Sequence, residues 1–134
     1  MKLIDFIKLA IGVPFLDHGR DFQGWDCWGL VVQTYQECFG IVIEDFSGLT
    51  GLNSTESEKL YENYRNSWIE IESGKEMPGD LIIMRTRVIH VGVVVKKNMM
   101  VHAQNDYGTL VESYTAAIWK SRIIGIYRHV KLAG

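Results

Sequence analysis

Apolar residues recur at helical spacing near the start of the chain. Across residues 3–11 they surround a narrow polar stripe formed by Lys2, Asp5 and Lys8, and Gly12 follows directly. This spacing is typical of a helix that hides most of its surface, and a glycine at its end is a common stop signal. The pattern predicts a mostly buried helix that ends at Gly12.

A second helical pattern begins directly after Asp26. Cys27 occupies its first position, and apolar or small residues repeat at helical spacing as far as Cys38. The Asp26 carboxylate can accept hydrogen bonds from backbone N–H groups of the first turn, and Gly40 can end the helix. We therefore expect a central helix with a cysteine in its first turn.

The rest of the chain alternates between apolar and polar residues, which is typical of strands. The predicted strands cover residues 68–72, 81–84, 88–95, 99–103, 110–113 and 123–130. Before them, a capping-box pattern at Thr55 and Glu58 predicts a more polar helix. Helices followed by strands favour an α+β fold with an antiparallel sheet, in a single domain that spans residues 1–134.

Two histidines lie on neighbouring predicted strands. On the most apolar strand, β-branched residues alternate with His90 and Gly92, so His90 points away from the face that they bury. A three-residue turn pairs Val95 with Met99 and places Gly92 opposite His102. His90 and His102 then share one face of the sheet as diagonal neighbours, roughly 7–8 Å apart.

A cysteine at a helix start and two histidines on one face can form a nucleophilic site. The helix dipole favours a thiolate, a nearby imidazole can accept the thiol proton, and a third polar group can fix the imidazole tautomer. The assignment is Cys27 as nucleophile, His90 as base and later acid, and His102 as orienting residue. Three alternatives remain open: a cysteine that only fills the core, structural histidines, or a zinc site, although no short Cys or His ligand pair supports a metal.

Composition excludes several classes of partner. A formal net charge of -2 indicates neither nucleic acid nor an anionic membrane, and no apolar run approaches the roughly 20 residues of a membrane span. Charges inside the first apolar stretch predict that there is no signal peptide. No cofactor motif is present. Cys27 and Cys38 would lie about 16 Å apart on one helix, beyond the roughly 7 Å that a disulfide bridges.

Three blocks of sequence follow one another along the chain. They are Gly12-Val13-Pro14-Phe15 through Gly24-Trp25-Asp26-Cys27-Trp28-Gly29-Leu30-Val31, then Pro78-Gly79-Asp80-Leu81 with His90-Val91-Gly92-Val93, and finally Met100-Val101-His102-Ala103. In this order they resemble the NlpC-type cell-wall cysteine peptidases, in which Asp-Cys-Ser-Gly-Leu-Val surrounds the nucleophile. The resemblance implies a papain-like fold, with the catalytic helix packed on an antiparallel sheet. It also implies hydrolysis of peptidoglycan stem peptides beside D-glutamyl and diamino acid residues, with Cys27, His90 and His102 in the roles given above.

Trp28 departs from the family pattern, because the family usually has serine there. Asp-Cys-Trp-Gly-Leu resembles the branch found in tailed-phage and gene-transfer particles, which implies a virion tail component, cytoplasmic before assembly, with tail-tip proteins as partners. Substrate contacts are expected at Trp25, Asp26, Trp28 and Phe15. The family usually has a tyrosine near the position of Phe15, and Phe15 lacks its hydroxyl. The backbone N–H of Cys27 is expected in an oxyanion hole.

Two other functions remain open: a structural tail-assembly module with little or no activity, and an amidase or acyltransferase that uses the same Cys–His pair.

Overall fold

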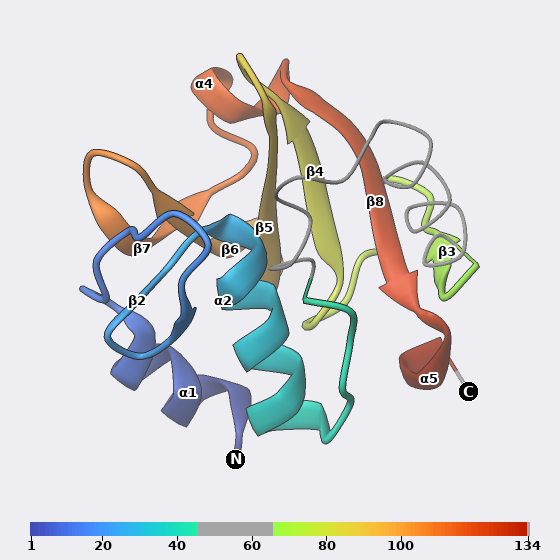
Figure 1. Cartoon of the computed structure of the whole chain (residues 1–134). Coiled ribbons are helices and arrows are strands. Elements are labelled where there is room, and N and C mark those ends of the chain that lie inside the picture. Colours follow the sequence, from blue (N-terminus) through green and yellow to red (C-terminus); the bar gives the residue numbers. More distant parts are fainter. Residues whose placement is uncertain (46–65, 134) are drawn as a thin grey trace, which may run out of the picture.

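A six-stranded antiparallel sheet forms the centre of the fold, with α1 and α2 on one of its faces (Figure 1). The computed structural model describes residues 1–45 and 66–133, so the helix predicted at Thr55 and Glu58 lies outside the described residues. The strands are β3 (Trp68–Glu70), β4 (Leu81–Arg85), β5 (Ile89–Lys96), β6 (Met99–Gln104), β7 (Gly108–Ser113) and β8 (Ile123–His129). Their order is β3-β8-β4-β5-β6-β7, which makes β3 an edge strand. The predicted α+β class with an antiparallel sheet is confirmed.

The helix that begins at the cysteine is confirmed as well. The helices within residues 1–45 and 66–133 are α1 (Leu3–Ala10), α2 (Cys27–Thr34), the π-helical turn η1 (Tyr35–Phe39), α4 (Ala117–Lys120) and α5 (Val130–Ala133). The π-helical turn continues α2 and stops at Gly40, whose φ of 63° is in the left-handed region that glycine enters without strain. The short strands β1 (Arg20–Asp21) and β2 (Gly24–Trp25) form a ribbon just before α2. None of the helices in the described residues is long and apolar enough to cross a membrane.

Both faces of the sheet are buried, and neighbouring residues of one strand serve different clusters. On β5, Val93 belongs to the cluster beneath α2, and Val94 belongs to the cluster on the opposite face. The second cluster is closed by Trp119 of α4, which returns over that face. Each fully buried aliphatic side chain contributes about 1.5–3 kcal/mol to folding, so both clusters fix the sheet relative to the helices.

The first helix is less buried than the sequence predicted. Phe6, Ile7 and Ala10 are buried, but Ile4 and Leu9 are each 58% exposed. The prediction was wrong because α1 packs on the protein with one side only: Leu9 is left exposed, and Ile4 lines a hollow between α1 and the sheet. Apolar residues all around a helix predict burial only where the fold supplies a second layer.

The hairpin that carries both histidines has the predicted register, although its turn differs. Val93 pairs with Val101 and Val94 with Met100, as predicted, but Lys96 rather than Val95 pairs with Met99. A β-bulge between Val94 and Lys96 absorbs the extra residue, which shortens the turn without moving the histidines to opposite faces.

Candidate active site

Cys27 is half-buried at the first position of α2 and lies against the start of β5. Backbone N–H groups of Val91, Trp28 and Cys27 itself lie near the thiol and favour its ionised form. Val91 directly follows His90 in the chain, so the cysteine lies beside the strand that carries the predicted base. Cys38 is also a free thiol but packs at the other end of the same helical segment.

Asp26 holds the helix start in place with three hydrogen bonds. One carboxylate oxygen accepts the Gly29 N–H at 2.8 Å and the Arg20 Nη1 at 2.7 Å, and the other accepts the His18 N–H at 3.0 Å. Arg20 in turn donates to its own neighbouring carbonyl, of Gly19, and to the carbonyl of Asp45. The predicted cap is confirmed, and it also joins the loop before the helix to its first turn.

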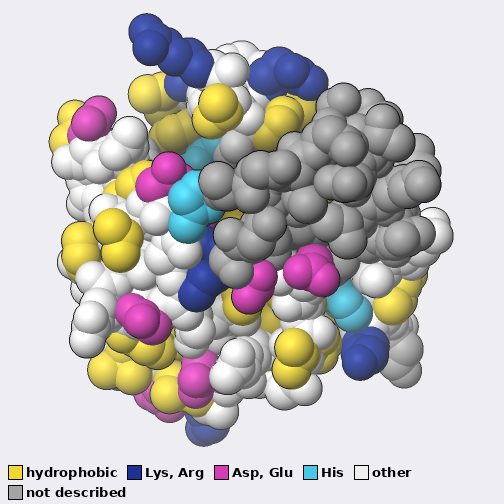
Figure 2. Space-filling view, viewed as in Figure 1, with side chains coloured by type: hydrophobic (Ala, Val, Ile, Leu, Met, Phe, Trp, Pro, Cys, Tyr) yellow, Lys and Arg dark blue, Asp and Glu magenta, His cyan; other side chains and the backbone are white. Residues whose placement is uncertain are grey.

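His90 and His102 face each other across the β5–β6 hairpin. His90 Nε2 and His102 Nδ1 are 2.8 Å apart, which is the distance of a hydrogen bond. His102 is fully buried, whereas His90 is only partly covered. In Figure 2, histidine and acidic side chains lie at the surface near the region where α2 begins in Figure 1.

Glu112 on β7 extends this chain of hydrogen bonds by one more group. Its Oε2 lies 2.9 Å from His102 Nε2, accepts Trp119 Nε1 at 2.7 Å and accepts Gln104 Nε2 at 3.3 Å. The Trp119 ring stacks on His90 with centroids 5.9 Å apart and planes inclined by 24°. Sequence reasoning missed both Glu112 and Trp119, although the hairpin argument applied to β7 would have found Glu112: Leu110 pairs with His102, and Glu112 is the next residue on that face.

Burial sets the charge states of the site. It raises the pKa of the Cys27 thiol; the Val91 N–H opposes this rise, and the negative charge of Asp26 adds to it. Burial also lowers the pKa of His90 to about 4, helped by the nearby His102, and lowers the pKa of His102 against the opposing hydrogen bond and charge of Glu112. The expectation that the helix start favours the thiolate is wrong in net direction, because desolvation is the larger effect. The resting site therefore holds a neutral thiol and neutral imidazoles.

The residues expected to contact substrate occupy different environments. Trp25 is fully buried, stacks on Phe6 and donates its Nε1 to Thr109 at 2.7 Å, so it belongs to the core and offers no surface to a ligand. Phe15 is half-buried and packs against the same core. Trp28 is also half-buried, with its Nε1 donating to the Glu44 carbonyl at 2.7 Å. The expectation for Trp25 is wrong because its side chain is fully buried in the core.

Zinc ligation by the cysteine and both histidines does not fit this geometry. His90 Nε2 and His102 Nδ1 point at each other, so those nitrogens cannot converge on one ion. Within the described part of the chain, the group of potential metal ligands comprises Asp17, His18 and Asp26, whose ligand atoms lie within 4.8 Å of one another. Asp26 already caps α2 and pairs with Arg20 there.

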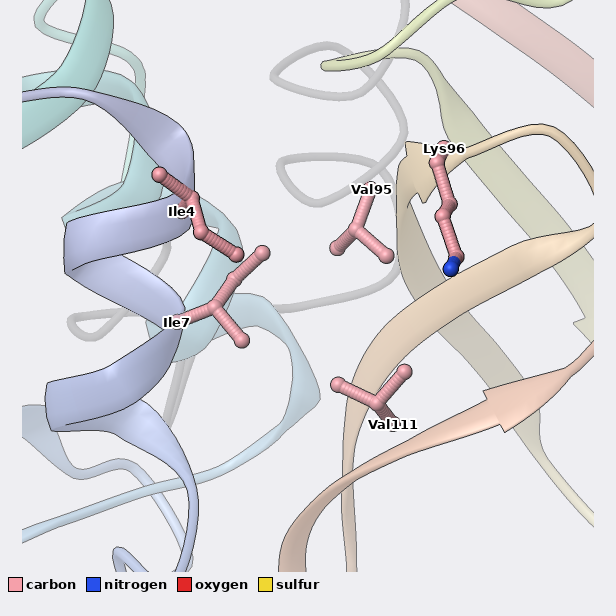
Figure 3. Close-up of a pocket in the computed structure, with 5 residues that line it drawn as sticks. All are labelled: Ile4, Ile7, Val95, Lys96 and Val111. Carbon is pink, nitrogen blue, oxygen red and sulfur yellow. The ribbon is translucent and has the colours of Figure 1, made fainter.

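An apolar hollow lies between α1 and the sheet. Its volume is about 270 Å³. Ile4, Ile7, Val95, Lys96 and Val111 line it, and Figure 3 shows Ile4 and Ile7 extending from the helix toward the strands that carry Val95 and Val111. None of the three residues assigned to the chemistry lines it. The hollow therefore offers apolar surface but no acid, base or nucleophile apart from one lysine.

Two proteins of known sequence are similar to most of this chain. Tail tip assembly protein K of Escherichia phage N15 is 26% identical over 132 residues, covering 91% of this chain and 52% of that protein. The murein DD-endopeptidase MepS/murein LD-carboxypeptidase of Escherichia coli (strain K12) is 27% identical over 119 residues, covering 83% of this chain and 53% of that protein. The chain thus spans about half the length of these relatives.

Solved structures share the fold. An NlpC/P60 family protein from Bacillus cereus has a TM-score of 0.71 at 20% identity and covers 96% of this chain, although only 39% of that chain. The NlpC/p60 domain of the peptidoglycan hydrolase SagA has a TM-score of 0.59 at 19% identity and covers 93% of both chains. A model of the NlpC/P60 family matches residues 12–128, from the loop before α2 almost to the end of β8. This chain belongs to the NlpC/P60 family.

Proposed function

We propose that this chain is a cysteine peptidase that hydrolyses peptide bonds in bacterial peptidoglycan stem peptides, beside D-glutamyl and diamino acid residues. The observation that carries the proposal is the hydrogen-bonded pair of His90 and His102, with Cys27 lying against the same strand. Family membership supports the substrate class, since a relative of similar sequence is named as a murein endopeptidase and carboxypeptidase.

In the proposed reaction Cys27 is the nucleophile, His90 the general base and acid, and His102 the residue that orients His90. His90 Nε2 is engaged with His102, so His90 Nδ1 is the nitrogen left to accept the thiol proton. Because burial keeps both groups neutral at rest, proton transfer accompanies attack instead of preceding it. The sulfur bonds to the scissile carbonyl carbon, and the carbonyl oxygen takes up the electron pair near the Cys27 N–H.

Collapse of this intermediate breaks the C–N bond. His90 returns its proton to the leaving amine, and a thioester between Cys27 and the acyl half of the peptide remains. A water molecule then attacks the thioester carbon while His90 accepts its proton. The C–S bond breaks, the acid product leaves, and His90 returns the proton to the Cys27 sulfur, which restores the thiol. The oxyanion is stabilised by the Cys27 backbone N–H at the start of α2, where the helix dipole also favours negative charge.

We further propose that the protein acts as a tail component of a phage or prophage, with other tail-tip proteins as partners. The similarity to a phage tail tip assembly protein supports this placement. Pull-down of an epitope-labelled chain from assembled particles would recover tail proteins if the placement is right. A chain found only free in the lysate, with assembled tails lacking it, would contradict the placement but not the chemistry.

Digestion of purified peptidoglycan tests the activity directly. Several peptidoglycan types are incubated with the protein, and the masses of the released fragments identify the bond that is cut. Cys27→Ala and Cys27→Ser are expected to abolish cleavage, and Cys38→Ala serves as the matched control because it removes the other free thiol without touching the site. Undiminished cleavage by Cys27→Ala would overturn the proposal. Product masses that report acyl transfer or amide hydrolysis elsewhere would favour the amidase or acyltransferase alternative.

A structural tail-assembly module is the second candidate. The raised pKa of the Cys27 thiol favours it, because a buried neutral thiol is a weak nucleophile until a base removes its proton. This candidate predicts that no peptidoglycan type is cut. It also predicts that iodoacetamide alkylates Cys27 near neutral pH no faster than it alkylates Cys38, whereas an assisted Cys27 should react faster than Cys38 in spite of its greater burial.

A further inference from the structure

Glu112 stands at the outer end of a hydrogen-bonded chain that runs through His102 to His90. We propose that Glu112, held by Trp119, fixes the tautomers of both histidines so that His90 Nδ1 carries the lone pair. Glu112 is thus a positioning residue, since it touches no reacting atom. Its consequence for turnover rests on the proposed function, but the tautomers are a property of the resting protein and are measurable without substrate.

Trp119 sets which atoms donate and which accept along this chain of hydrogen bonds. An indole Nε1–H can only donate, and it lies 2.7 Å from Glu112 Oε2. That oxygen therefore accepts from the indole, and an ionised carboxylate, whose oxygens only accept, meets this requirement. The same oxygen lies 2.9 Å from His102 Nε2, and two acceptors cannot share a hydrogen bond, so His102 Nε2 must carry a proton.

The proton arrangement then propagates to His90. Burial lowers the pKa of His102, so near neutral pH its ring holds one proton, and that proton is on Nε2. His102 Nδ1 is left as an acceptor, and its partner 2.8 Å away, His90 Nε2, must donate. His90 is neutral as well, so its Nδ1 has no proton and can act as a base.

Packing keeps this arrangement from reversing. Trp119 stacks on His90 and makes an edge contact with His102, whose ring centroid lies 5.1 Å from that of the indole. His102 is fully buried, so it has no access to water as a substitute partner. Gln104 donates a third hydrogen bond to Glu112 Oε2 at 3.3 Å, which also requires an accepting oxygen.

The Glu112 charge has a second effect in the reaction. When His90 takes the thiol proton, it becomes an imidazolium whose Nε2–H still donates to neutral His102. The negative charge of Glu112 favours protonated His90 and so stabilises the intermediate in which His90 is charged. No proton leaves His102 or reaches Glu112 in this scheme.

Nitrogen-15 NMR of the imidazole rings tests the tautomers. In the wild-type protein near neutral pH, His90 and His102 are each expected to show a pyrrole-type Nε2 and a pyridine-type Nδ1. Glu112→Ala is expected to give His102 a mixed tautomer, and with it a partly protonated His90 Nδ1. A wild-type His90 that is protonated on Nδ1 would overturn the proposal, as would spectra of Glu112→Ala identical to those of the wild type.

Kinetics test the charge with a variant that keeps the geometry. Glu112→Gln retains an accepting oxygen and removes the charge, so kcat on stem peptides is expected to fall roughly tenfold while KM stays within about twofold. Glu76→Gln is the matched control: Glu76 also accepts a hydrogen bond from an aromatic residue, Tyr114, and its other oxygen accepts from the Gly74 N–H rather than from a histidine. An unchanged kcat in Glu112→Gln, or an equal fall in Glu76→Gln, would refute the charge role.

The two proposals fail in different ways. If the peptidase assignment is wrong, no variant shows turnover, yet the wild-type NMR spectrum still reports the tautomers. If only the Glu112 proposal is wrong, Cys27→Ala still abolishes cleavage, while Glu112→Gln cleaves as the wild type does. Circular dichroism of each variant verifies that it is folded before either result is interpreted.

Discussion

Replacing Gly29 with alanine should destabilise the protein, although the helix rules alone predict the opposite. Gly29 lies in the first turn of α2, where alanine is preferred to glycine by up to about 1 kcal/mol. Its φ is not in the left-handed region, so alanine meets no backbone strain there. The surroundings decide the sign: a Cβ at this position would lie 2.1 Å from the Gly19 carbonyl oxygen and 2.8 Å from the Trp25 Cβ.

Relief of this collision requires a shift of the backbone. An ordinary contact between a Cβ and an oxygen is about 1.3 Å longer, and the blocking atoms are main chain or fully buried, so neither can rotate away. Overpacking of this kind costs about 1–3 kcal/mol or more. The 2.1 Å approach to a main-chain oxygen puts this cost at the upper end, about 3 kcal/mol. Since helix propensity returns no more than about 1 kcal/mol, the net loss should be about 2 kcal/mol, and Cys27 should move relative to β5.

Urea denaturation of Gly29→Ala measures this loss. A net change of about 2 kcal/mol lowers the urea midpoint by roughly 1 M and the Tm by roughly 6–10 °C. Gly74→Ala is the control: alanine there meets open space but must adopt a φ of 96°, so it loses only about 1 kcal/mol and keeps full activity. If Gly29→Ala equals or exceeds the wild type in stability, the collision does not control the packing of the helix start.

Three further predictions concern single side chains. Asp26→Ala should lose about 1–2 kcal/mol of stability in urea because the helix start and Arg20 both lose their acceptor, and an unchanged midpoint would contradict the cap. His90 has a pKa of about 4 in the folded protein, against an ordinary value near 6.5. Its contribution to stability is therefore present above pH 6.5 and is lost as the pH falls toward 4, because the unfolded chain binds the proton first. Urea midpoints measured across that range should therefore fall more steeply in the wild type than in His90→Gln, and parallel curves would contradict the low pKa. Tyr114→Phe should cost about 1 kcal/mol, because a phenol whose pKa is raised to about 12 stays protonated and donates to Glu76; thermal melts that match the wild type would contradict this bond.

The predictable parts of the fold are those set by the helical or strand periodicity of residues close together in the sequence. The capped helix at Asp26 and Cys27 follows from side-chain chemistry within a few residues, and the face of His90 follows from the alternation of a strand. The pairing of His90 with His102 was predictable even though the turn was not, because the β-bulge before Lys96 restored the expected register. Local rules therefore brought together the central pair of the site.

The outer part of the site depends on contacts between distant segments, which no local period encodes. Trp119 reaches His90 only because the chain crosses back over the sheet after β7, and nothing in its neighbouring residues predicts that return. The raised pKa of Cys27 depends in the same way on burial against β5. A helix-start cysteine predicts a stabilised thiolate in isolation, and only the tertiary structure reveals that desolvation is stronger.

The contacts that hold α2 in place are also those that place the cysteine. The Asp26 carboxylate ties the helix start to Arg20, and Gly29 permits close approach to the loop on the same side. On the other side, the thiol of Cys27 rests on the Val91 N–H of β5. A loosened contact on either side lowers stability and moves the sulfur relative to His90 at the same time. Stability and turnover should therefore fall together in variants of the helix start, whereas Glu112→Gln should separate them, since it keeps an accepting oxygen for Trp119 and removes the charge that acts on His90.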